Sequence, residues 1–159
     1  MVKNCTFAQG VLYTYKNITD SLFVNCYTNA YYYYSIYMFR FGGSSQTIKN
    51  TKFVNCFIGN KVWYSSKPCL VYTSGCYIRA CDFVNCYCGS GAGTSYFFYG
   101  TLRMYDTRVL NCYTSSPHTS YFFYGTSYIY NSRFLNCSAG TSWGGTKYFF
   151  RTTSYIYNS

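Results

Sequence analysis

Apolar triplets followed by a polar pair recur along the chain at nearly constant distances. The clearest form is Phe-x-Asn-Cys, in which an apolar run ends at an asparagine and a cysteine. The Asn-Cys pairs begin at residues 4, 25, 55, 85, 111 and 136, so successive copies lie 21, 30, 30, 26 and 25 residues apart. Because the pattern recurs only at this distance, with no three-and-four spacing inside it, it predicts a repeat architecture without helices.

Two more strand-like stretches precede each Asn-Cys pair. The segments 96–113, 121–138 and 147–159 show them best: a Tyr-Phe-Phe-Tyr-like strand a, a Gly/Ser/Thr turn, a Tyr-Ile-Tyr-like strand b, and a tight corner before strand c, which carries Phe-x-Asn-Cys. Short runs rich in Tyr, Phe, Ile and Val between Gly, Ser, Thr and Asn are the usual strand signal. A variable loop after strand c accounts for most of the difference in repeat length.

We therefore predict an all-β fold, a right-handed single-stranded parallel β-helix (solenoid) of about six coils of three short strands. It is one domain over residues 1–159, with repeats 1–20, 21–50, 51–80, 81–106, 107–131 and 132–159. The chain starts inside strand c and stops one strand short of the next copy. We expect a segment of a longer array, or a subunit that stacks end to end into a filament through uncapped ends.

Equivalent residues of stacked coils should form columns along the solenoid axis. The inner column on strand b is Ile18, Ile48, Ile78, Met104 and Ile129, and the inner column on strand c is Phe23, Phe53, Phe83, Val109 and Phe134. Between them lie the corner residues Asp20, Asn50, Ala80, Asp106 and Asn131. Asn and Asp suit corners that need a left-handed backbone.

The run Ile-x-Asn-(Ser/Thr)-x-Phe-x-Asn-Cys followed by Gly-Gly resembles the polymorphic outer membrane protein repeat family, whose repeats carry Phe-x-x-Asn and Gly-Gly-Ala/Ile motifs. Here Trp143-Gly144-Gly145-Thr146 stands at the Gly-Gly position, and Cys replaces the second Asn. Members are β-helical surface proteins and adhesins of bacteria and some parasitic protists. The resemblance implies a cell-surface or extracellular location, cell-surface partners, and a non-catalytic scaffold or adhesin-like stalk.

The composition narrows the class of protein further. The 159 residues include 23 Tyr, 14 Phe and only 10% charged residues, which excludes a disordered chain. No apolar run approaches the roughly 20 residues of a membrane span, and no signal sequence opens the chain. The net charge of +10 favours anionic partners.

Cations gather beside the corner between strands b and c. This basic stripe consists of Lys49 and Arg79 before the corner and Lys52, Arg108 and Arg133 after it. Asp82 lies among them, and Tyr105 and Tyr130 interleave. The stripe is either an ordinary solvated surface or a docking track for a polyanion such as an acidic glycan, with Tyr rings for stacking on sugars. No nucleic-acid-binding motif accompanies it, so we expect no specific nucleic-acid partner.

An apolar ridge should face outward on strand c. If Phe and Cys point inward, the residues between them point out: Val24, Val54, Val84, Leu110 and Leu135. Exposed ridges of this kind mark interfaces. We expect a loop, a neighbouring β-helix or another part of the parent protein to cover it; the reverse orientation would bury it instead.

The cysteine column predicts buried thiols. Stacked coils place equivalent Cα atoms about 4.8 Å apart, within disulfide range, but parallel side chains hold the Cβ atoms about as far apart, beyond the preferred distance. Some disulfides remain the main alternative. No Cys-x-x-Cys pair occurs and the single histidine, His118, is in a loop, so we predict no metal and no cofactor.

The asparagines of the Asn-Cys pairs should bond to one another along the axis and satisfy buried polar groups. Asn17 heads a glycosylation sequon outside this column, and its amide is free to carry a glycan if the chain is secreted. Catalysis is not expected: the chain has one His and no Glu, and Asp20 and Asp106 lie three coils apart. Thr and Tyr that recur in each coil would suit an ice-ordering surface, but strand a does not keep them in one flat array.

Overall fold

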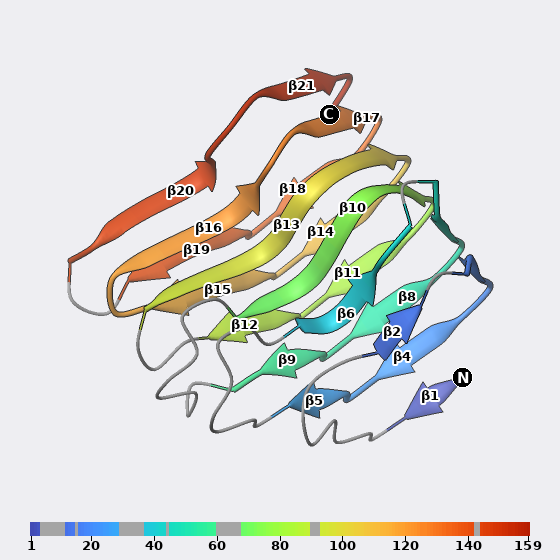
Figure 1. The fold of residues 1–159 in the computed structure, drawn as a ribbon, viewed down its shortest axis with the longest axis horizontal. Coiled ribbons are helices and arrows are strands. Elements are labelled where there is room, and N and C mark those ends of the chain that lie inside the picture. The colour runs from blue at the N-terminus through green and yellow to red at the C-terminus, as the bar shows by residue number, and fades with distance from the viewer. Residues whose placement is uncertain are drawn as a thin grey trace.

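A computed structural model of the chain describes residues 1–3, 12–14, 16–28, 37–43, 45–59, 68–89, 93–141 and 144–159. Strands pair in parallel with their equivalents one turn away, so the chain is an all-β solenoid, as the repeats predict (Figure 1). It completes about four turns between the corners at Asn25 and Asn136. The predicted count of six coils is larger because it includes the incomplete windings at both ends.

Three parallel sheets form the sides of the solenoid. The long sheet contains strands a and b: β2 (Leu12–Thr14), β3 (Ile18–Thr19), β6 (Tyr37–Phe41), β7 (Thr47–Lys49), β10 (Cys69–Arg79), β13 (Thr94–Tyr105), β16 (Thr119–Tyr124), β17 (Ser127–Tyr130), β20 (Thr146–Phe150) and β21 (Ser154–Tyr157). The strand-c sheet contains β1 (Val2–Lys3), β4 (Leu22–Val24), β8 (Lys52–Val54), β11 (Asp82–Val84), β14 (Arg108–Leu110) and β18 (Arg133–Leu135). The third sheet contains β5 (Tyr27–Thr28), β9 (Phe57–Ile58), β12 (Tyr87–Gly89), β15 (Tyr113–Ser116) and β19 (Ser138–Thr141).

The third sheet corrects the prediction for the segment after strand c. That segment is predicted as a variable loop, yet it begins with a short strand whose inward residue is buried, such as Ile58, Cys88 or Thr114. These strands have only two to four residues, which is too short for alternation to be recognised in the sequence. Most of the variation in length lies beyond them, between the third sheet and the long sheet.

The predicted turn between strands a and b is also absent in two coils, where β10 and β13 each run through both strands. The ladder between them shifts register at Ser74 and Cys76. Gly100 has a φ of 110°, and a Cβ atom there would collide with the carbonyl oxygen of Thr73 in the preceding coil. Glycine at this bend therefore lets the backbones of adjacent coils touch while the strand continues.

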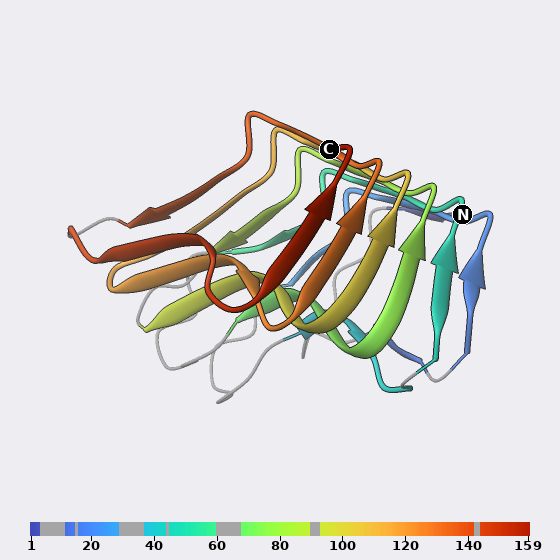
Figure 2. The ribbon, with the colours of Figure 1, turned by 90° about the horizontal axis from the view of Figure 1, so that it is seen from above.

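Each coil has two tight corners, one between strands b and c and one directly after strand c, and each corner consists of two residues. The first residue of every described corner has a left-handed backbone, with φ between 48° and 53°, as predicted for the Asn and Asp positions. The second residue donates a hydrogen bond to the carbonyl two residues earlier. Thr107 Oγ1 reaches the oxygen of Tyr105 at 2.9 Å, and Cys112 Sγ reaches the oxygen of Leu110 at 3.3 Å. Figure 2 shows that these corners line up along the axis.

The core contains the predicted inner columns. Ile48, Ile78, Met104 and Ile129, and Phe53, Phe83 and Val109, are completely buried, whereas Ile18 and Phe134 are half-buried. The rings of Phe53 and Phe83 stack with centroids 4.7 Å apart. Strand a, which had no predicted inner column, adds two more Phe columns, with Phe97 on Phe122 at 4.6 Å and Phe98 on Phe123 at 4.9 Å.

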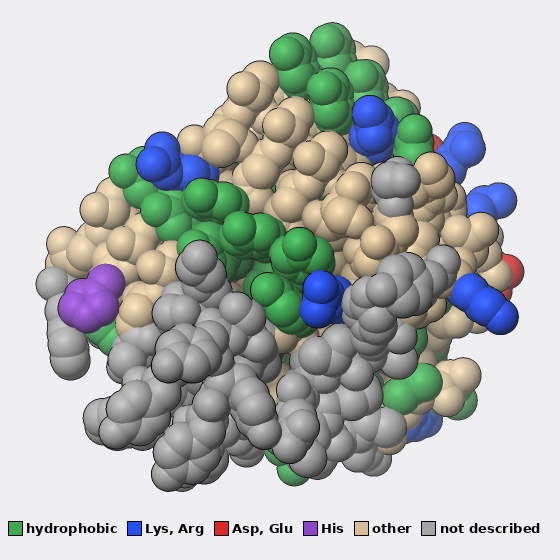
Figure 3. All heavy atoms as spheres, viewed as in Figure 1, with side chains coloured by type: hydrophobic (Ala, Val, Ile, Leu, Met, Phe, Trp, Pro, Cys, Tyr) green, Lys and Arg blue, Asp and Glu red, His purple; other side chains and the backbone are tan. Residues whose placement is uncertain are grey.

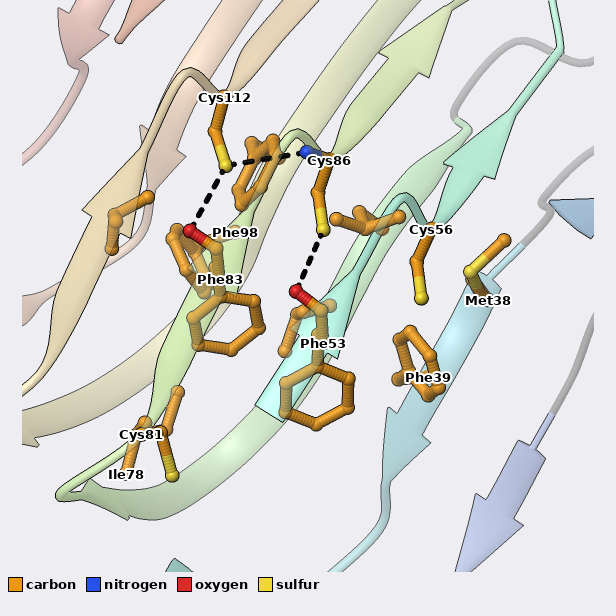
Figure 4. Packing of buried hydrophobic residues seen from close by; sticks show 14 of the residues in the cluster. Met38, Phe39, Phe53, Cys56, Ile78, Cys81, Phe83, Cys86, Phe98 and Cys112 are labelled. Carbon is orange, nitrogen blue, oxygen red and sulfur yellow. Dashed lines mark hydrogen bonds between the residues drawn. The ribbon is translucent and has the colours of Figure 1, made fainter. Parts of the chain in front are cut away.

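The cysteine column lies beside this aromatic core. Cys56, Cys86 and Cys112 point inward in a line along the Phe side chains (Figure 4). Within the described part of the chain, all nine cysteines are free thiols, the arrangement that the sequence favours; Cys5 lies outside it. Burial raises the pKa of Cys86 well above its ordinary value, so this thiol is protonated at neutral pH.

Candidate functional site

The five cations of the basic stripe lie in two rows on either side of the corner between strands b and c. Lys49 and Arg79 are register partners on β7 and β10. On the other side Lys52, Asp82, Arg108 and Arg133 follow one another through four strands of the strand-c sheet. The five cations are exposed. Figure 3 shows Lys and Arg side chains along the right-hand edge of the molecule, with acidic side chains among them.

Asp82 neutralises part of this stripe. The Nε and Nη2 atoms of Arg108 donate to its two carboxylate oxygens, each at 2.7 Å, and Lys52 Nζ lies 3.9 Å from Oδ2. The hydrogen bond to Asp82 raises the pKa of Arg108 above its ordinary value. Bidentate pairing of this kind holds the guanidinium in place. The cations after the corner are therefore less available to an anionic ligand than their number suggests. Lys49 and Arg79, before the corner, are the stronger candidates for binding an anion.

Strand b presents two parallel columns of outward side chains on the long sheet. The first column is Thr47, Tyr77, Arg103, Tyr128 and Tyr155. The second column is Lys49, Arg79, Tyr105, Tyr130 and Tyr157. The strands that carry them lie side by side in Figure 2. Both columns combine aromatic rings with cations, and the second includes two members of the basic stripe.

Rings and guanidinium groups stack closely within these columns. Arg103 lies between two rings of the first column, 5.3 Å from the centroid of Tyr77 and 5.1 Å from that of Tyr128. In the second column Tyr130 stacks on Tyr105 at 4.9 Å and on Tyr157 at 4.8 Å. Cation–π and ring stacking therefore order a surface that would otherwise consist of long, mobile side chains.

A hollow of about 300 Å³ opens between the two columns, lined by Thr47, Tyr77, Arg79 and Tyr105. Its lining offers two aromatic rings, a hydroxyl group and a guanidinium. Rings of this kind pack on the apolar faces of sugars, and a guanidinium can hold a carboxylate or sulfate through two parallel hydrogen bonds. Of the sequence-predicted site residues, the structure thus brings together Arg79 and Tyr105, while Arg108 and Arg133 lie on the neighbouring sheet.

Strand a carries a further tyrosine column that the sequence analysis did not identify. Tyr72, Tyr99 and Tyr124 are register partners, with ring centroids 5.4 and 5.0 Å apart. Arg40 pairs in register with Tyr72, and Arg151 follows Phe150, the partner of Phe123, so an arginine occupies the equivalent position at each end. The signal was present in the sequence: the fourth residue of the Tyr-Phe-Phe-Tyr motif is Arg in the segments 37–40 and 148–151.

Burial changes the acidity of two tyrosines on strand a. Burial raises the pKa of Tyr96 and of Tyr99 above the ordinary tyrosine value. Both phenols therefore keep their protons at physiological pH.

The ridge residues of strand c face away from the core. Four of them are half-buried, namely Val24, Val54, Val84 and Leu110, and Leu135 is 44% exposed. The residue that precedes each of them on strand c, such as Phe53 or Phe83, points inward. Whether a partner covers the ridge stays a prediction.

The adjacent asparagine column forms the expected axial bonds. Asn55 donates to Asn25 at 3.1 Å, and the series continues through Asn85, Asn111 and Asn136. These amides are exposed, so the expectation that they satisfy buried groups was wrong. The reason is that the left-handed corner turns each amide away from the core, where it bonds to its neighbour one coil away.

Asn17 is exposed, but its side-chain amide is not free, contrary to the prediction. Its oxygen accepts a hydrogen bond from the backbone N–H of Thr47 at 2.9 Å. Glycosylation would use the amide nitrogen and remains a prediction. Asn4, at the head of another sequon, lies outside the described residues.

All three carboxylate side chains of the protein have structural partners. Asp20 accepts from Asn50 at 3.0 Å, Asp106 accepts from Asn131 at 3.4 Å, and Asp82 holds Arg108. Over the residues that the structure describes, no three His, Cys, Asp or Glu side chains come together as a metal site would require. No helix in this part of the chain is long and apolar enough to cross a membrane.

Comparison with protein-family models, with curated proteins and with solved structures finds no match for this chain.

Proposed function

We propose that this chain is a non-catalytic scaffold, a right-handed β-helix of about six coils that serves as the adhesin-like stalk of a surface protein outside the cell. Two features support a scaffold. Identical side chains stack in register through successive coils, and each of the three carboxylates is engaged in a structural bond. A general acid or base needs a carboxyl group aimed at substrate, whereas these groups close corners and hold an arginine.

The stalk binds an acidic glycan on its strand-b face. The observation that carries this role is the hollow between the two strand-b columns, with Arg79 beside the rings of Tyr77 and Tyr105. A uronic acid or sulfated sugar would place its anionic group on the guanidinium and its ring on a tyrosine. Lys49, the register partner of Arg79, adds a second positive charge one coil away.

The test measures binding of a polyuronate and of a neutral glucan of similar length by calorimetry. The wild-type chain should bind the polyuronate and not the neutral glucan, and affinity should fall steeply between about 50 and 200 mM salt, because counterions compete for cations in contact with a polyanion. Arg79→Gln should abolish binding. Arg133→Gln is the matched control, because it removes an exposed stripe cation outside the hollow and should leave most of the affinity.

Two results would contradict this binding site. Equal losses from Arg79→Gln and Arg133→Gln would show that net charge, and not the hollow, attracts the glycan. Binding of neither glycan by the wild-type chain would leave the scaffold role without a sugar ligand.

A further inference from the structure

Tyr105, Tyr130 and Tyr157 form a stack of three nearly parallel phenol rings on adjacent coils. Their planes differ by 5° and 4°, and their centroids lie 4.9 and 4.8 Å apart. Tyr105 and Tyr130 are half-buried and Tyr157 is 50% exposed, so solvent reaches the stack. Tyr130 is the central ring of the stack and has one tyrosine on each side.

We propose that this stack is a site of oxidative modification, at which a peroxidase with hydrogen peroxide joins Tyr130 to Tyr105 or to Tyr157 as dityrosine. Each phenol loses one electron and one proton and becomes a tyrosyl radical. The two radicals form one carbon–carbon bond between ring positions ortho to the oxygens, and the hydrogens on these carbons move to the phenol oxygens. The two electrons and two protons removed convert one hydrogen peroxide to two molecules of water.

The fold favours coupling within one chain over coupling between chains. Groups held in contact react as if their concentration were very high, with effective molarities on the order of 10⁵ M or more in well-oriented pairs. Free chains at micromolar concentration cannot compete with such a neighbour. Coupling requires the stacked rings to turn about their side-chain bonds so that two ortho carbons, now about one coil spacing apart, come within bonding distance.

Other tyrosine pairs meet these conditions less well. Tyr96 and Tyr121 stack at 5.2 Å, but Tyr96 is only 6% exposed, which restricts access of an oxidant. Tyr128 has a tyrosine on one side only, because Arg103 occupies the other. The strand-a column of Tyr72, Tyr99 and Tyr124 also has a tyrosine on each side of its central ring, but its centroids lie 5.4 and 5.0 Å apart and its ring planes differ by 14° and 13°. The stack centred on Tyr130 has the closer and more nearly parallel rings, so it is the preferred site on the long sheet.

A dityrosine bond here links adjacent coils of the solenoid. Tyr105 and Tyr130 belong to β13 and β17, which pair only through backbone hydrogen bonds and side-chain packing. A covalent bond between them would close a loop of chain from residue 105 to residue 130, which spans consecutive repeats. It limits how far those coils can separate in the unfolded state, as any cross-link does.

The experiment oxidises the folded wild-type chain at micromolar concentration with a peroxidase and hydrogen peroxide. We expect dityrosine fluorescence in material that remains monomeric on a denaturing gel, and an intact mass lower by two hydrogen atoms. Trypsin cleavage after Arg103, Arg108 and Arg133 releases segment 104–108, whose one tyrosine is Tyr105. This segment should appear joined to segment 109–133, and fragmentation should place the bond on Tyr130.

Tyr130→Phe keeps the stacked ring but removes the phenol, and it should abolish both links to Tyr130. The matched control is Tyr27→Phe, because Tyr27 stacks on Phe57 at 5.5 Å and has no phenol opposite it in that coil. This control should retain the wild-type cross-linked peptides. Circular dichroism checks that both variants keep the wild-type fold.

Three outcomes would overturn the proposal. These are an unchanged peptide pattern in Tyr130→Phe, bonds spread evenly over the tyrosines, and products formed mainly between chains. Wild-type chain unfolded in urea serves as a further check, since it should lose the link between segments 104–108 and 109–133.

Discussion

The corner between strands b and c and the corner after strand c share one backbone geometry but contain different side chains. Each has a left-handed residue followed by a residue that bonds to the carbonyl two positions earlier. After strand c the pair is always Asn-Cys in the described turns. Between strands b and c the first residue is Asp, Asn or Ala, and the second is Ser or Thr except at Cys81.

This comparison separates what a corner requires from what it tolerates. A left-handed backbone and a short side chain with a hydrogen-bond donor occur at every described corner of both kinds. A continuous column of polar side chains is not needed between strands b and c, because Ala80 interrupts it there without changing the backbone, with φ at 51°. A thiol and a hydroxyl group can occupy the same corner position and donate the same hydrogen bond to the carbonyl two residues earlier. They differ in acidity and in the neighbours they suit.

The largest expected effect concerns Cys81, the single thiol in the column of hydroxyl groups. Burial raises the pKa of Cys81 to about 11 from an ordinary value of 9.0. Between these pH values the unfolded thiol has lost its proton while the folded thiol keeps it, so the free energy of unfolding falls as pH rises. The loss attributable to Cys81 should reach about 2 to 3 kcal/mol at pH 11 and be absent below pH 9.

Cys81→Ser isolates this contribution, because a hydroxyl does not titrate in the range. Urea unfolding from pH 7 to 11 should show equal stability at pH 7 and a smaller decline for the variant above pH 9. Titration of the tyrosines and of the other thiols is common to both proteins and cancels in the difference. Parallel curves for the two proteins would mean that Cys81 keeps its ordinary acidity when folded.

A smaller effect should follow from the same substitution at the other corner. Cys86 lies between the thiols of Cys56 and Cys112 and donates to the carbonyl of Phe53 at 3.3 Å. Serine there is shorter and more polar, so Cys86→Ser leaves a small gap beside the phenylalanines and should cost about 1 to 2 kcal/mol at pH 7. Cys81→Ser is the matched control and should stay within about 0.5 kcal/mol of wild type, since Thr51 and Thr107 flank it. Equal losses in urea unfolding would remove the distinction between the two corners.

The smallest effect is a gain in stability. Ala80→Asn should relieve an alanine held in the left-handed region and let the new amide donate to Asn50, adding about 1 kcal/mol to the free energy of unfolding. Ala80→Asp is the control: its carboxylate has no N–H to donate and adds a negative charge one coil from Asp106. Thermal unfolding should rank Asn above Asp at this position. A ranking with Asp first would show that the amide column adds nothing here.

The repeats of the sequence were sufficient to predict the solenoid, the corners and most of the core. Each column contains several equivalent residues, so a repeat whose sequence departs from the motif does not hide the pattern. Met104 and Val109 occupy inner positions although the equivalent residues in other coils are Ile and Phe. The third sheet could not be predicted, because strands as short as Phe57–Ile58 carry no alternation of their own. They form only because adjacent coils supply partners.

The candidate site was predicted only in part. Arg79 and Tyr105 were named from their spacing beside the corner, but the sequence did not show that Tyr77 and Thr47 complete a hollow with them. The pairing of Asp82 with Arg108 also depends on register across coils, which fixes distances that sequence spacing leaves open. Side-chain columns on one face become visible in the sequence only after the coil length is known for every repeat.

The two corners also determine where this protein can change. Two residues separate the strands at each described corner, whereas the segment between the third sheet and the long sheet ranges from two residues after β15 to ten after β9. The connection between strands a and b also varies, from none in β10 and β13 to five residues between β6 and β7. Insertions and deletions at these two places leave the hydrogen-bonded columns in register. The solenoid is thus a fixed frame with two places that tolerate changes in length, and a new binding loop could be grafted at the longer of them, beyond the third sheet, without redesigning a coil.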